Sequence, residues 1–252
     1  MKFLKSEMKK NCILISCGSF NPPTIMHLRL FELAKDHLQG CGWNVLGGMI
    51  SPTHDNYKRK KPSLTVSSNH RVKMVELALK NYDFVRCTKW ESEQDDWTRT
   101  REVLEEHQKQ MNQVLDASFN HTDKFPHLPD SLLGLNSDKD KEPNAFKLFM
   151  ICGGDLLESF SVPNLWKDED IEVMVRDFGL IVITREGSNP EQYVEKHPIV
   201  NQHKDNIYIV NEKITNDISS TKIREAVKNG NSIKFFVDNS VISYISENKL
   251  YL

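Results

Sequence analysis

The sequence predicts an α/β fold, with a doubly wound, mostly parallel sheet and helices on both faces. Three observations indicate this class. Short apolar runs typical of buried strands alternate with segments whose apolar residues recur at spacings of three and four, as on one helical face. A glycine turn joins the first run to the first helical pattern. The 252 residues suffice to bury one large core or two small ones, and one core fits better, so we expect a single domain over residues 1–252.

Each predicted strand is an apolar run bounded by polar or turn residues. The runs lie at residues 12–17, 45–50, 84–88, 146–152, 178–184 and 207–211. Helical spacing follows most of them, as in a parallel sheet with crossover helices. The first three helical stripes contain Leu30, Phe31, Ala34 and Leu38, then Val72, Val75 and Leu79, then Leu104, His107, Met111 and Leu115. The simplest interpretation of these stripes is packing against the sheet.

The composition excludes several classes of function. Lys and Arg number 33 against 35 Asp and Glu, a net charge of −2, which argues against nucleic acid or an anionic membrane as the main partner. No apolar stretch approaches the roughly 20 residues that span a bilayer. The N-terminus lacks the apolar core of a signal peptide. We therefore expect no membrane span and an intracellular protein, in the nucleus and/or the cytoplasm.

The cysteines and histidines do not predict a metal site. The five cysteines have no paired metal spacing, and Cys12, Cys17 and Cys152 lie in or beside predicted strands. We expect them to be reduced core thiols. The nine histidines are scattered, and the acidic residues form no metal-loop signature.

Residues from about 117 to 146 interrupt the alternation of strands and helices. They are rich in His, Asp, Asn, Ser, Lys and Pro and have little apolar periodicity. A segment of this composition cannot bury enough apolar surface to order itself, so we expect a disordered insertion. It contains neither a basic cluster nor a cysteine for acylation, and it therefore predicts no cellular address.

The turn after the first strand predicts a nucleotide ligand. Gly18 lets the backbone approach a ligand closely, and Pro22-Pro23 leads into a helix whose predicted N-cap is Thr24. A helix N-terminus attracts anions. His27 follows Thr24 by three residues, so both lie on one face, where the imidazole can donate to phosphate oxygens. A single histidine at such a place is more often merely packed or solvent-facing, so the rest of the pattern must decide.

A second segment, Ser219-Ser220-Thr221-Lys222-Ile223-Arg224, precedes another helical pattern that ends at Gly230. Arg224 falls in the first turn of that helix, where a cation is unfavourable unless an anion is bound. Its planar fork can hold two phosphate oxygens at once. No carboxylate stands at the capping-box position to compete with a phosphate. The alternative interpretation is an ordinary surface arginine.

These motifs resemble those of a known superfamily. Gly18-x-Phe20-x-Pro22-x-Thr24-x-x-His27 resembles the signature of the nucleotidyltransferases, and residues 219–224 resemble their other ATP-binding motif. Further matching strings begin at Ile50, Trp90, Gly153, Val162 and Asn216. From about residue 12 to the C-terminus, except near 117–146, the chain is similar to the animal nicotinamide/nicotinic acid mononucleotide adenylyltransferases. The resemblance implies a Rossmann-like fold and a transferase of NAD biosynthesis.

The resemblance also implies a set of site residues. The implied catalytic residues are His27 and Arg224. The implied ATP-binding residues are Gly18, Ser19, Phe20, Thr24, His27, Arg59, Asn216, Ser220, Thr221, Lys222 and Arg224. The implied mononucleotide-binding residues are Ser19, Tyr57, Trp90, Glu93, Gly153, Asp155, Leu165, Trp166 and Arg185.

Some of these assignments have alternatives. Trp90 and Trp166 are implied to hold the pyridine ring, and their polar neighbours favour a pocket rim over the alternative of core packing. Arg59 stands where the family usually has lysine, which keeps the charge but alters the phosphate geometry. For Lys60 and Lys61 a solvated basic loop is as good an interpretation as a place in the site, and both are left out of the site.

The implied reaction is attack by a mononucleotide phosphate oxygen on the α-phosphorus of ATP. The substrates are ATP and nicotinamide mononucleotide, or its nicotinic acid analogue. The attacking phosphate is already ionised at neutral pH, so the protein needs neither a nucleophilic side chain nor a general base. Mg²⁺ is expected to arrive with ATP. The sequence is also compatible with a homo-oligomer.

Two other functions remain open at this point. One is an adenylyltransferase or cytidylyltransferase with a different acceptor or nucleotide, which the tryptophan pair and residues 162–166 disfavour. The other is a chaperone-like holdase role, which has been proposed for members of the family. A holdase would survive the loss of His27, whereas the enzyme would not.

Overall fold

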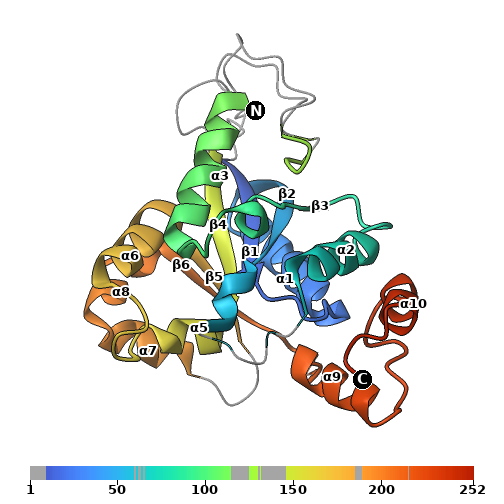
Figure 1. Ribbon diagram of the computed structural model, residues 1–252. Helices are drawn as coiled ribbons and strands as arrows, with labels where there is room; N and C mark the ends of the chain where they lie inside the picture. The colour runs from blue at the N-terminus through green and yellow to red at the C-terminus, as the bar shows by residue number, and fades with distance from the viewer. Residues whose placement is uncertain are drawn as a thin grey trace.

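The computed structural model describes residues 10–59, 61, 64, 66–114, 125–129, 131, 146–184, 189–214 and 216–252. Its centre is a six-stranded sheet with the strand order β3-β2-β1-β4-β5-β6, in which every pair of neighbours is parallel (Figure 1). The strands are β1 Lys10–Gly18, β2 Trp43–Pro52, β3 Val85–Cys87, β4 Phe146–Gly153, β5 Leu180–Thr184 and β6 Ile207–Asn211. All six predicted strands are confirmed, and the sheet is doubly wound about β1 and β4.

Helices cover both faces of the sheet. The α-helices are α1 Ile25–Gly40, α2 Ser68–Ala78, α3 Thr100–Val114, α5 Gly154–Ser159, α6 Asp168–Val173, α7 Pro190–Lys196, α8 Pro198–Gln202, α9 Ser220–Lys228 and α10 Asn239–Glu247. Shorter turns are the 3-10 helices η1 Asp55–Arg59, η2 Glu91–Glu93 and η5 Lys204–Asn206, and the π-helix η4 Met174–Phe178. Leu115, predicted in the third helical stripe, lies outside the described residues.

The central strand explains why there are two layers of helices. Successive side chains of a strand point to opposite faces. Ile13 and Ile15 accordingly pack in a core with residues of α3 and α6, whereas Cys12 and Leu14 pack in a second core with residues of α1 and α2. Figure 1 shows α3 and α6 on the opposite side of the sheet from α1 and α2. All four side chains are fully buried. A strand that is buried on both faces has a continuous run of apolar residues, and β1 has such a run.

A third apolar cluster joins the C-terminal helices to the sheet domain. It contains Met74 from α2, Ile223 from α9 and Val241 from α10. The His70 ring also forms a 2.8 Å hydrogen bond with the Tyr244 hydroxyl. This packing fixes α9, which carries the second predicted motif, against α2. The expected end of that helix is also found, because α9 stops at Lys228 and Gly230 has a φ of 69°.

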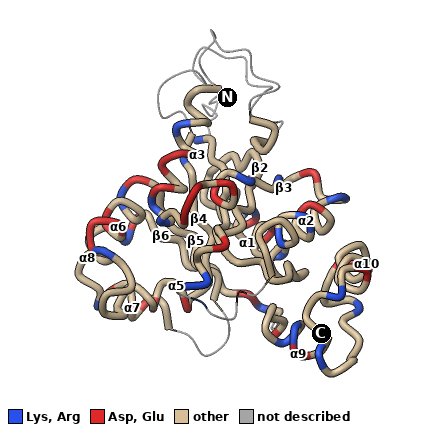
Figure 2. Tube along the Cα trace, in the orientation of Figure 1, with Lys and Arg blue, Asp and Glu red and all other residues tan. Residues whose placement is uncertain are grey.

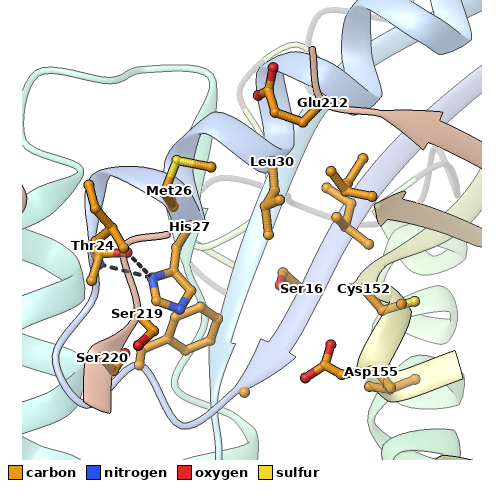
Figure 3. A pocket seen from close by; sticks show the side chains of 18 of the residues that line it. Ser16, Thr24, Met26, His27, Leu30, Cys152, Asp155, Glu212, Ser219 and Ser220 are labelled. Carbon is orange, nitrogen blue, oxygen red and sulfur yellow. Dashed lines mark hydrogen bonds between the residues drawn. The ribbon is translucent and has the colours of Figure 1, made fainter. Parts of the chain in front are cut away.

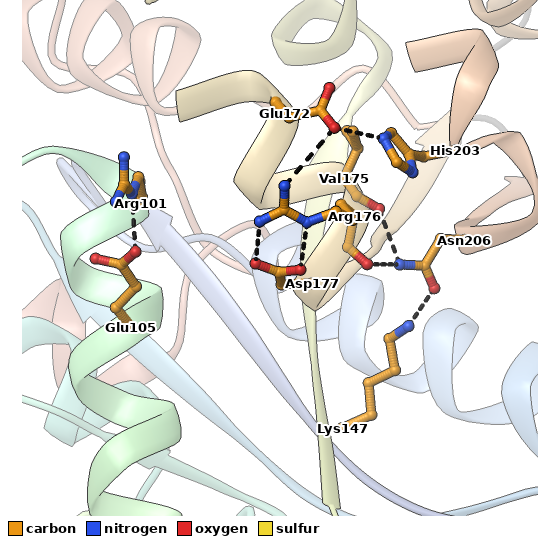
Figure 4. A network of polar contacts seen from close by, with 9 residues as sticks. All are labelled: Arg101, Glu105, Lys147, Glu172, Val175, Arg176, Asp177, His203 and Asn206. Atoms are coloured by element: carbon orange, nitrogen blue, oxygen red, sulfur yellow. Dashed lines mark hydrogen bonds and ion pairs between the residues drawn. The ribbon is translucent and has the colours of Figure 1, made fainter. Parts of the chain in front are cut away.

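Polar contacts organise the chain around the π-helix η4, on the side that packs α6 against α8 (Figure 4). The Asn206 side chain donates to the Val175 carbonyl at 2.8 Å, and the His203 ring pairs with Glu172 at 2.8 Å.

Gly179 ends η4 with a φ of 87°. A Cβ there would lie 2.8 Å from the Asn206 carbonyl oxygen, so only glycine fits this turn.

The segment around residues 117–146 is described only in part. Residues 125–129 lie on the α3 side of the sheet, where Leu128 is buried in the core and the His127 ring bonds the Gln110 side chain at 2.7 Å. The rest of the segment, apart from residues 131 and 146, lies outside the described residues. Both the disordered insertion and the single domain therefore stay predictions.

Three further properties complete the fold. None of the five cysteines forms a disulfide. Burial raises the pKa of the Cys12 and Cys152 thiols to about 12, so both are protonated and unreactive. Within the described chain, no helix combines the length and apolar character needed to cross a lipid bilayer. Acidic and basic residues are interspersed over the helices (Figure 2).

The close approach of α1 to β2 generates a prediction about stability. A Cβ at Gly48 would lie 2.6 Å from the Phe31 ring, which is fully buried and cannot give way easily. Gly48→Ala should therefore lower the free energy of unfolding by about 1–3 kcal/mol, measured by urea denaturation. The matched control is Gly40→Ala in α1, where an added Cβ meets nothing within 4 Å. Equal stability of the two variants would contradict this packing.

Candidate active site

The candidate site lies where the sheet topology reverses direction. After β1 the chain crosses toward β2, and after β4 it crosses toward β5, so a crevice opens between the carboxyl ends of β1 and β4. Two clefts meet there, a first cleft of 1070 Å³ and a second of 670 Å³. Both are lined at their common boundary by Cys17, Gly18, Ser19, Asp155 and Leu156.

The first cleft gathers most of the predicted ATP-binding residues. Its walls come from the turn after β1, the start of α1, the ends of β4 and β5, and the start of α9 (Figure 3). The predicted residues that line it are Gly18, Ser19, Phe20, Thr24, His27, Asn216 and Ser220, together with Gly153 and Asp155 from the mononucleotide set. Its apolar lining includes Met26, Leu30, Ile151 and Ile183.

The start of α1 determines which tautomer a neutral His27 ring adopts. Thr24 is the N-cap, as predicted, and its backbone N–H donates to His27 Nδ1 at 2.9 Å (Figure 3). The Thr24 hydroxyl lies 2.9 Å from the same nitrogen. Because Nδ1 accepts the N–H hydrogen bond, the ring proton of the neutral imidazole is on Nε2. His27 can therefore act as a hydrogen-bond donor toward an anion through Nε2.

Protein groups already occupy part of the α1 N-terminus. The Ile25 N–H donates to the Phe236 carbonyl at 3.1 Å, and the His27 N–H donates to the Thr24 carbonyl at 3.0 Å. Anion attraction here therefore depends on the helix dipole and the His27 ring more than on these two amides. The Phe20 ring packs edge-on against His27, with 5.2 Å between the ring centroids.

The start of α9 joins the second motif to the first. Ser219 is the N-cap, and its hydroxyl accepts from the Lys222 N–H at 3.3 Å. The Ser220 hydroxyl donates to the Pro22 carbonyl at 2.8 Å. Arg224 donates to the Asn21 carbonyl at 2.8 Å and to the Thr221 hydroxyl at 3.2 Å. Side chains of α9 therefore hold the turn that precedes α1.

Several predicted ATP-binding residues lie outside both sets of cleft-lining residues. Arg224 contacts the first motif as described, and the Thr221 hydroxyl accepts from Arg224. Lys222 pairs with Asp217 at 3.1 Å. The Arg59 side chain is 69% exposed and pairs with Asp96 at 3.6 Å. These positions surround the clefts without forming their walls.

The second cleft is lined by aromatic and charged side chains. Tyr57, Leu165 and Trp166 lie there, as predicted, and the Trp166 Nε1–H donates to the Ser159 hydroxyl at 2.9 Å. Sequence reasoning missed a further group of lining residues, namely Thr53, Lys61, Glu91, Trp97, Arg99, Thr100, Arg101 and Asp170. Lys61, which the sequence interpretation leaves out of the site, has its Nζ 3.4 Å from the Ser19 hydroxyl. Lys60 lies outside the described residues.

Trp97, not Trp90, is the second tryptophan of this cleft. Trp90 packs against the core beside the buried His107, with 6.0 Å between the rings, which is the core-packing alternative. Trp97 stacks on Tyr57, with 6.0 Å between centroids and 26° between planes. Polar neighbours, the argument applied to Trp90, also surround Trp97 between Asp96 and Thr98 and could have identified it.

The three other predicted mononucleotide residues are placed as follows. Glu93 is exposed and lines neither cleft. Gly153 belongs to the first cleft, and a Cβ there would lie 2.5 Å from Asp155 Oδ1, so glycine makes room for that carboxylate. Arg185 lies outside the described residues.

Glu91 is a buried carboxyl in the wall of the second cleft. It is 4% exposed, and Ser51 donates to its Oε2 at 2.7 Å. Burial raises the pKa of Glu91 to about 7, against the opposing effects of hydrogen bonds from Ser51 and Thr53 and of the Arg71 charge. The second cleft therefore contains a carboxyl that changes charge near neutral pH.

Two adjoining clefts at a switch point, one of them bounded by two helix starts, define a nucleotide-binding α/β protein with room for two ligands. Within the described ranges, no three His, Cys, Asp or Glu side chains gather closely enough to hold a metal ion.

Comparison with known proteins identifies the class more narrowly. Residues 15–226 match the family described as Cytidylyltransferase-like. The Bos taurus nicotinamide/nicotinic acid mononucleotide adenylyltransferase 1 is 42% identical over 98% of this chain and 91% of its own length. The Drosophila melanogaster nicotinamide-nucleotide adenylyltransferase is 42% identical over 94% of this chain and 60% of its own length.

A solved structure shares the fold. It is the Plasmodium falciparum nicotinic acid mononucleotide adenylyltransferase complexed with NaAD, with a TM-score of 0.54 and 22% identity over 96% of this chain and 97% of that one. The chain belongs to the Cytidylyltransferase-like family and, within it, to the nicotinamide/nicotinic acid mononucleotide adenylyltransferases. The Rossmann-like fold and the family assignment made from the motifs are confirmed.

The buried carboxyl of Glu91 generates a prediction about pH. Its pKa rises from 4.5 in the unfolded chain to about 7 in the fold, so its stabilising contribution is complete below pH 4.5 and is lost as the pH rises through 7. Between pH 4 and pH 8, the free energy of unfolding of the wild type should fall by about 3 kcal/mol relative to Glu91→Gln, measured in urea.

Glu93→Gln, an exposed substitution on the same turn, controls for the removal of a negative charge. If the wild type and Glu91→Gln show the same pH dependence of unfolding, Glu91 does not titrate in this range.

Proposed function

We propose that this protein transfers the adenylyl group of ATP to nicotinamide mononucleotide, and to nicotinic acid mononucleotide, giving NAD or its deamido form and pyrophosphate. The observation that carries the proposal is the shared boundary of the two clefts at Gly18-Ser19 and Asp155-Leu156. With ATP in the first cleft and the mononucleotide in the second, the two reacting phosphates meet at this boundary. The names of the relatives support this choice of substrates.

The first cleft suits ATP because its polar groups match a triphosphate. The α1 dipole and the His27 Nε2–H offer positive potential on one side, and the start of α9 offers a second helix terminus through Ser219 and Ser220. The apolar side chains of Leu30 and Ile183 are suited to a flat base. Contact between Arg224 and the triphosphate stays a prediction, because its guanidinium bonds Asn21 and Thr221 here.

The second cleft suits a mononucleotide with a cationic ring. Trp166 and the stacked pair Tyr57 and Trp97 present aromatic faces, which attract a pyridinium. Lys61, beside Ser19 at the boundary, can attract the phosphate of the same ligand. The ring then lies at the aromatic end and the phosphate at the boundary.

The chemistry needs alignment and charge neutralisation. A mononucleotide phosphate oxygen attacks the α-phosphorus, a new P–O bond forms, and the bond from the α-phosphorus to the bridging oxygen breaks as pyrophosphate leaves. No proton need be removed from the attacking oxygen. His27 contributes by donating from Nε2 to a phosphate oxygen as charge moves onto the leaving group.

Magnesium is proposed to arrive with ATP. Mg²⁺ commonly takes one carboxylate together with phosphate oxygens and water. Asp155 is the acidic side chain at the boundary of the two clefts, and it fits that role. When bound, the ion would neutralise part of the triphosphate charge. An intracellular location, in the nucleus and/or the cytoplasm, is proposed on composition and on the reduced cysteines.

The role of His27 generates the first test of this function. Purified protein with ATP, Mg²⁺ and nicotinamide mononucleotide should form NAD, followed by coupled reduction. His27→Ala should lower kcat by about 100- to 1,000-fold, because it removes a donor aimed at developing charge. The control is His37→Ala at the other end of α1, outside both clefts. Absence of product from either pyridine mononucleotide would refute the proposal.

The aromatic wall of the second cleft generates another prediction. Trp97→Ala should raise the KM for nicotinamide mononucleotide roughly 3- to 30-fold, the worth of a cation–π contact, and leave the KM for ATP nearly unchanged. Trp43→Phe, at the amino end of β2 and away from both clefts, is the control. An unchanged mononucleotide KM in Trp97→Ala would place the pyridine ring elsewhere.

A further inference from the structure

Arg71 is a fully buried arginine behind the candidate site. It lies in α2, and its side chain is 0% exposed. A buried guanidinium is costly unless its donors are satisfied. Nε donates to the Val66 carbonyl at 3.1 Å, and Nη1 to the Ser19 carbonyl at 2.9 Å. Nη2 donates to the Thr53 carbonyl at 2.6 Å and to Asp55 Oδ1 at 3.0 Å.

The acceptors of Arg71 belong to segments that build the two clefts. Ser19 lies at the boundary of both clefts, and Thr53 lines the second. Asp55 begins η1, which carries Tyr57 into the second cleft. The Thr53 N–H also donates to the Gly18 carbonyl at 2.9 Å. One planar side chain therefore fixes the turn after β1 relative to the segment after β2, which a flexible ammonium could not do at all four acceptors.

The bond from Arg71 to Ser19 determines the orientation of one peptide group. The Ser19 carbonyl points at the buried guanidinium. Because a trans peptide is planar, the N–H of Phe20 in the same peptide points in the opposite direction, away from Arg71. An N–H attracts a phosphate, whereas a carbonyl oxygen in its place would repel it.

The same peptide is held in a strained conformation. Phe20 has a φ of 46°, in the left-handed region that bulky residues rarely adopt. Rotating the Ser19–Phe20 peptide by about half a turn would bring this φ into the favourable extended region. That rotation would break the bond to Arg71 and reverse the carbonyl and the N–H. The bond from Arg71 to the Ser19 carbonyl therefore opposes this relaxation.

We propose that Arg71 is a positioning residue that locks the Ser19–Phe20 peptide with its N–H toward the substrate phosphates and keeps η1 in register with this turn. The inference rests on the proposed function, since it concerns the phosphates of the same two ligands. Arg71 touches neither substrate. Its effect passes through the backbone of the first motif.

The test uses Arg71→Lys and Arg71→Met in the full chain. Lys keeps the charge and the aliphatic stem but loses the fork, so Arg71→Lys should fold. Per folded molecule, its kcat should fall about 10- to 100-fold, the scale of a small misplacement of reacting groups. The kcat of Arg71→Met per folded molecule should fall at least as far. Val75→Ala, on the same helix and fully buried in the sheet core, is the control for lost stability alone.

Comparison of ATP with adenosine separates positioning from general loosening of the cleft. Calorimetry should show weaker binding of ATP to Arg71→Lys, while competition should show unchanged binding of adenosine, which has no phosphate. Equal weakening of both ligands, or a kcat per folded molecule like that of Val75→Ala, would overturn the proposal. If wild-type protein makes no NAD, the proposed function fails, but the binding comparison still decides the role of Arg71.

Discussion

The burial of β1 on both faces is the constraint on which the rest of the structure depends. Four successive residues, Cys12 to Ile15, are fully buried, so a layer of helices must cover each face of the sheet. The chain covers both faces of the sheet by moving toward one edge of the sheet after β1, to β2, and toward the other edge after β4, to β5. That reversal opens the crevice at the ends of these two strands. The position of the candidate site therefore follows from the packing of the core.

The proposed reaction brings two polyanions together on a chain that has a net charge of −2. Basic and acidic residues are interspersed over the surface, so attraction for phosphate must be local (Figure 2). In the proposed function it comes from the starts of α1 and α9 and the proton on His27 Nε2. The positive charge of Arg71 acts differently, because it is buried and engaged by carbonyl oxygens. It organises the backbone that faces the phosphates.

Much of the fold and part of the site could be predicted from sequence because local patterns carry them. The six strands are apolar runs, and the Thr24 cap with His27 three residues later is a matter of helical spacing. The second cleft was predicted less well. Trp90 and Trp97 have similar polar neighbours in sequence, and only the tertiary structure shows that Trp90 packs against the core beside His107 while Trp97 lines the second cleft. Likewise Glu91 is buried and the nearby Glu93 is exposed, although both occupy one short turn.

The sequence by itself determined the fold class, the order of strands and helices along the chain, the two motifs and the family. These depend on residues close together in the chain, where periodicity and turn chemistry act directly. Only the tertiary structure decided which side chains share a cleft. It also decided that Arg224 bonds Asn21, which lies 203 residues earlier in the chain, and that Arg71 joins the segments after β1 and β2. Such contacts depend on how the helices pack on the sheet. The sequence does not show whether a long charged side chain contacts water, a phosphate or a buried carbonyl.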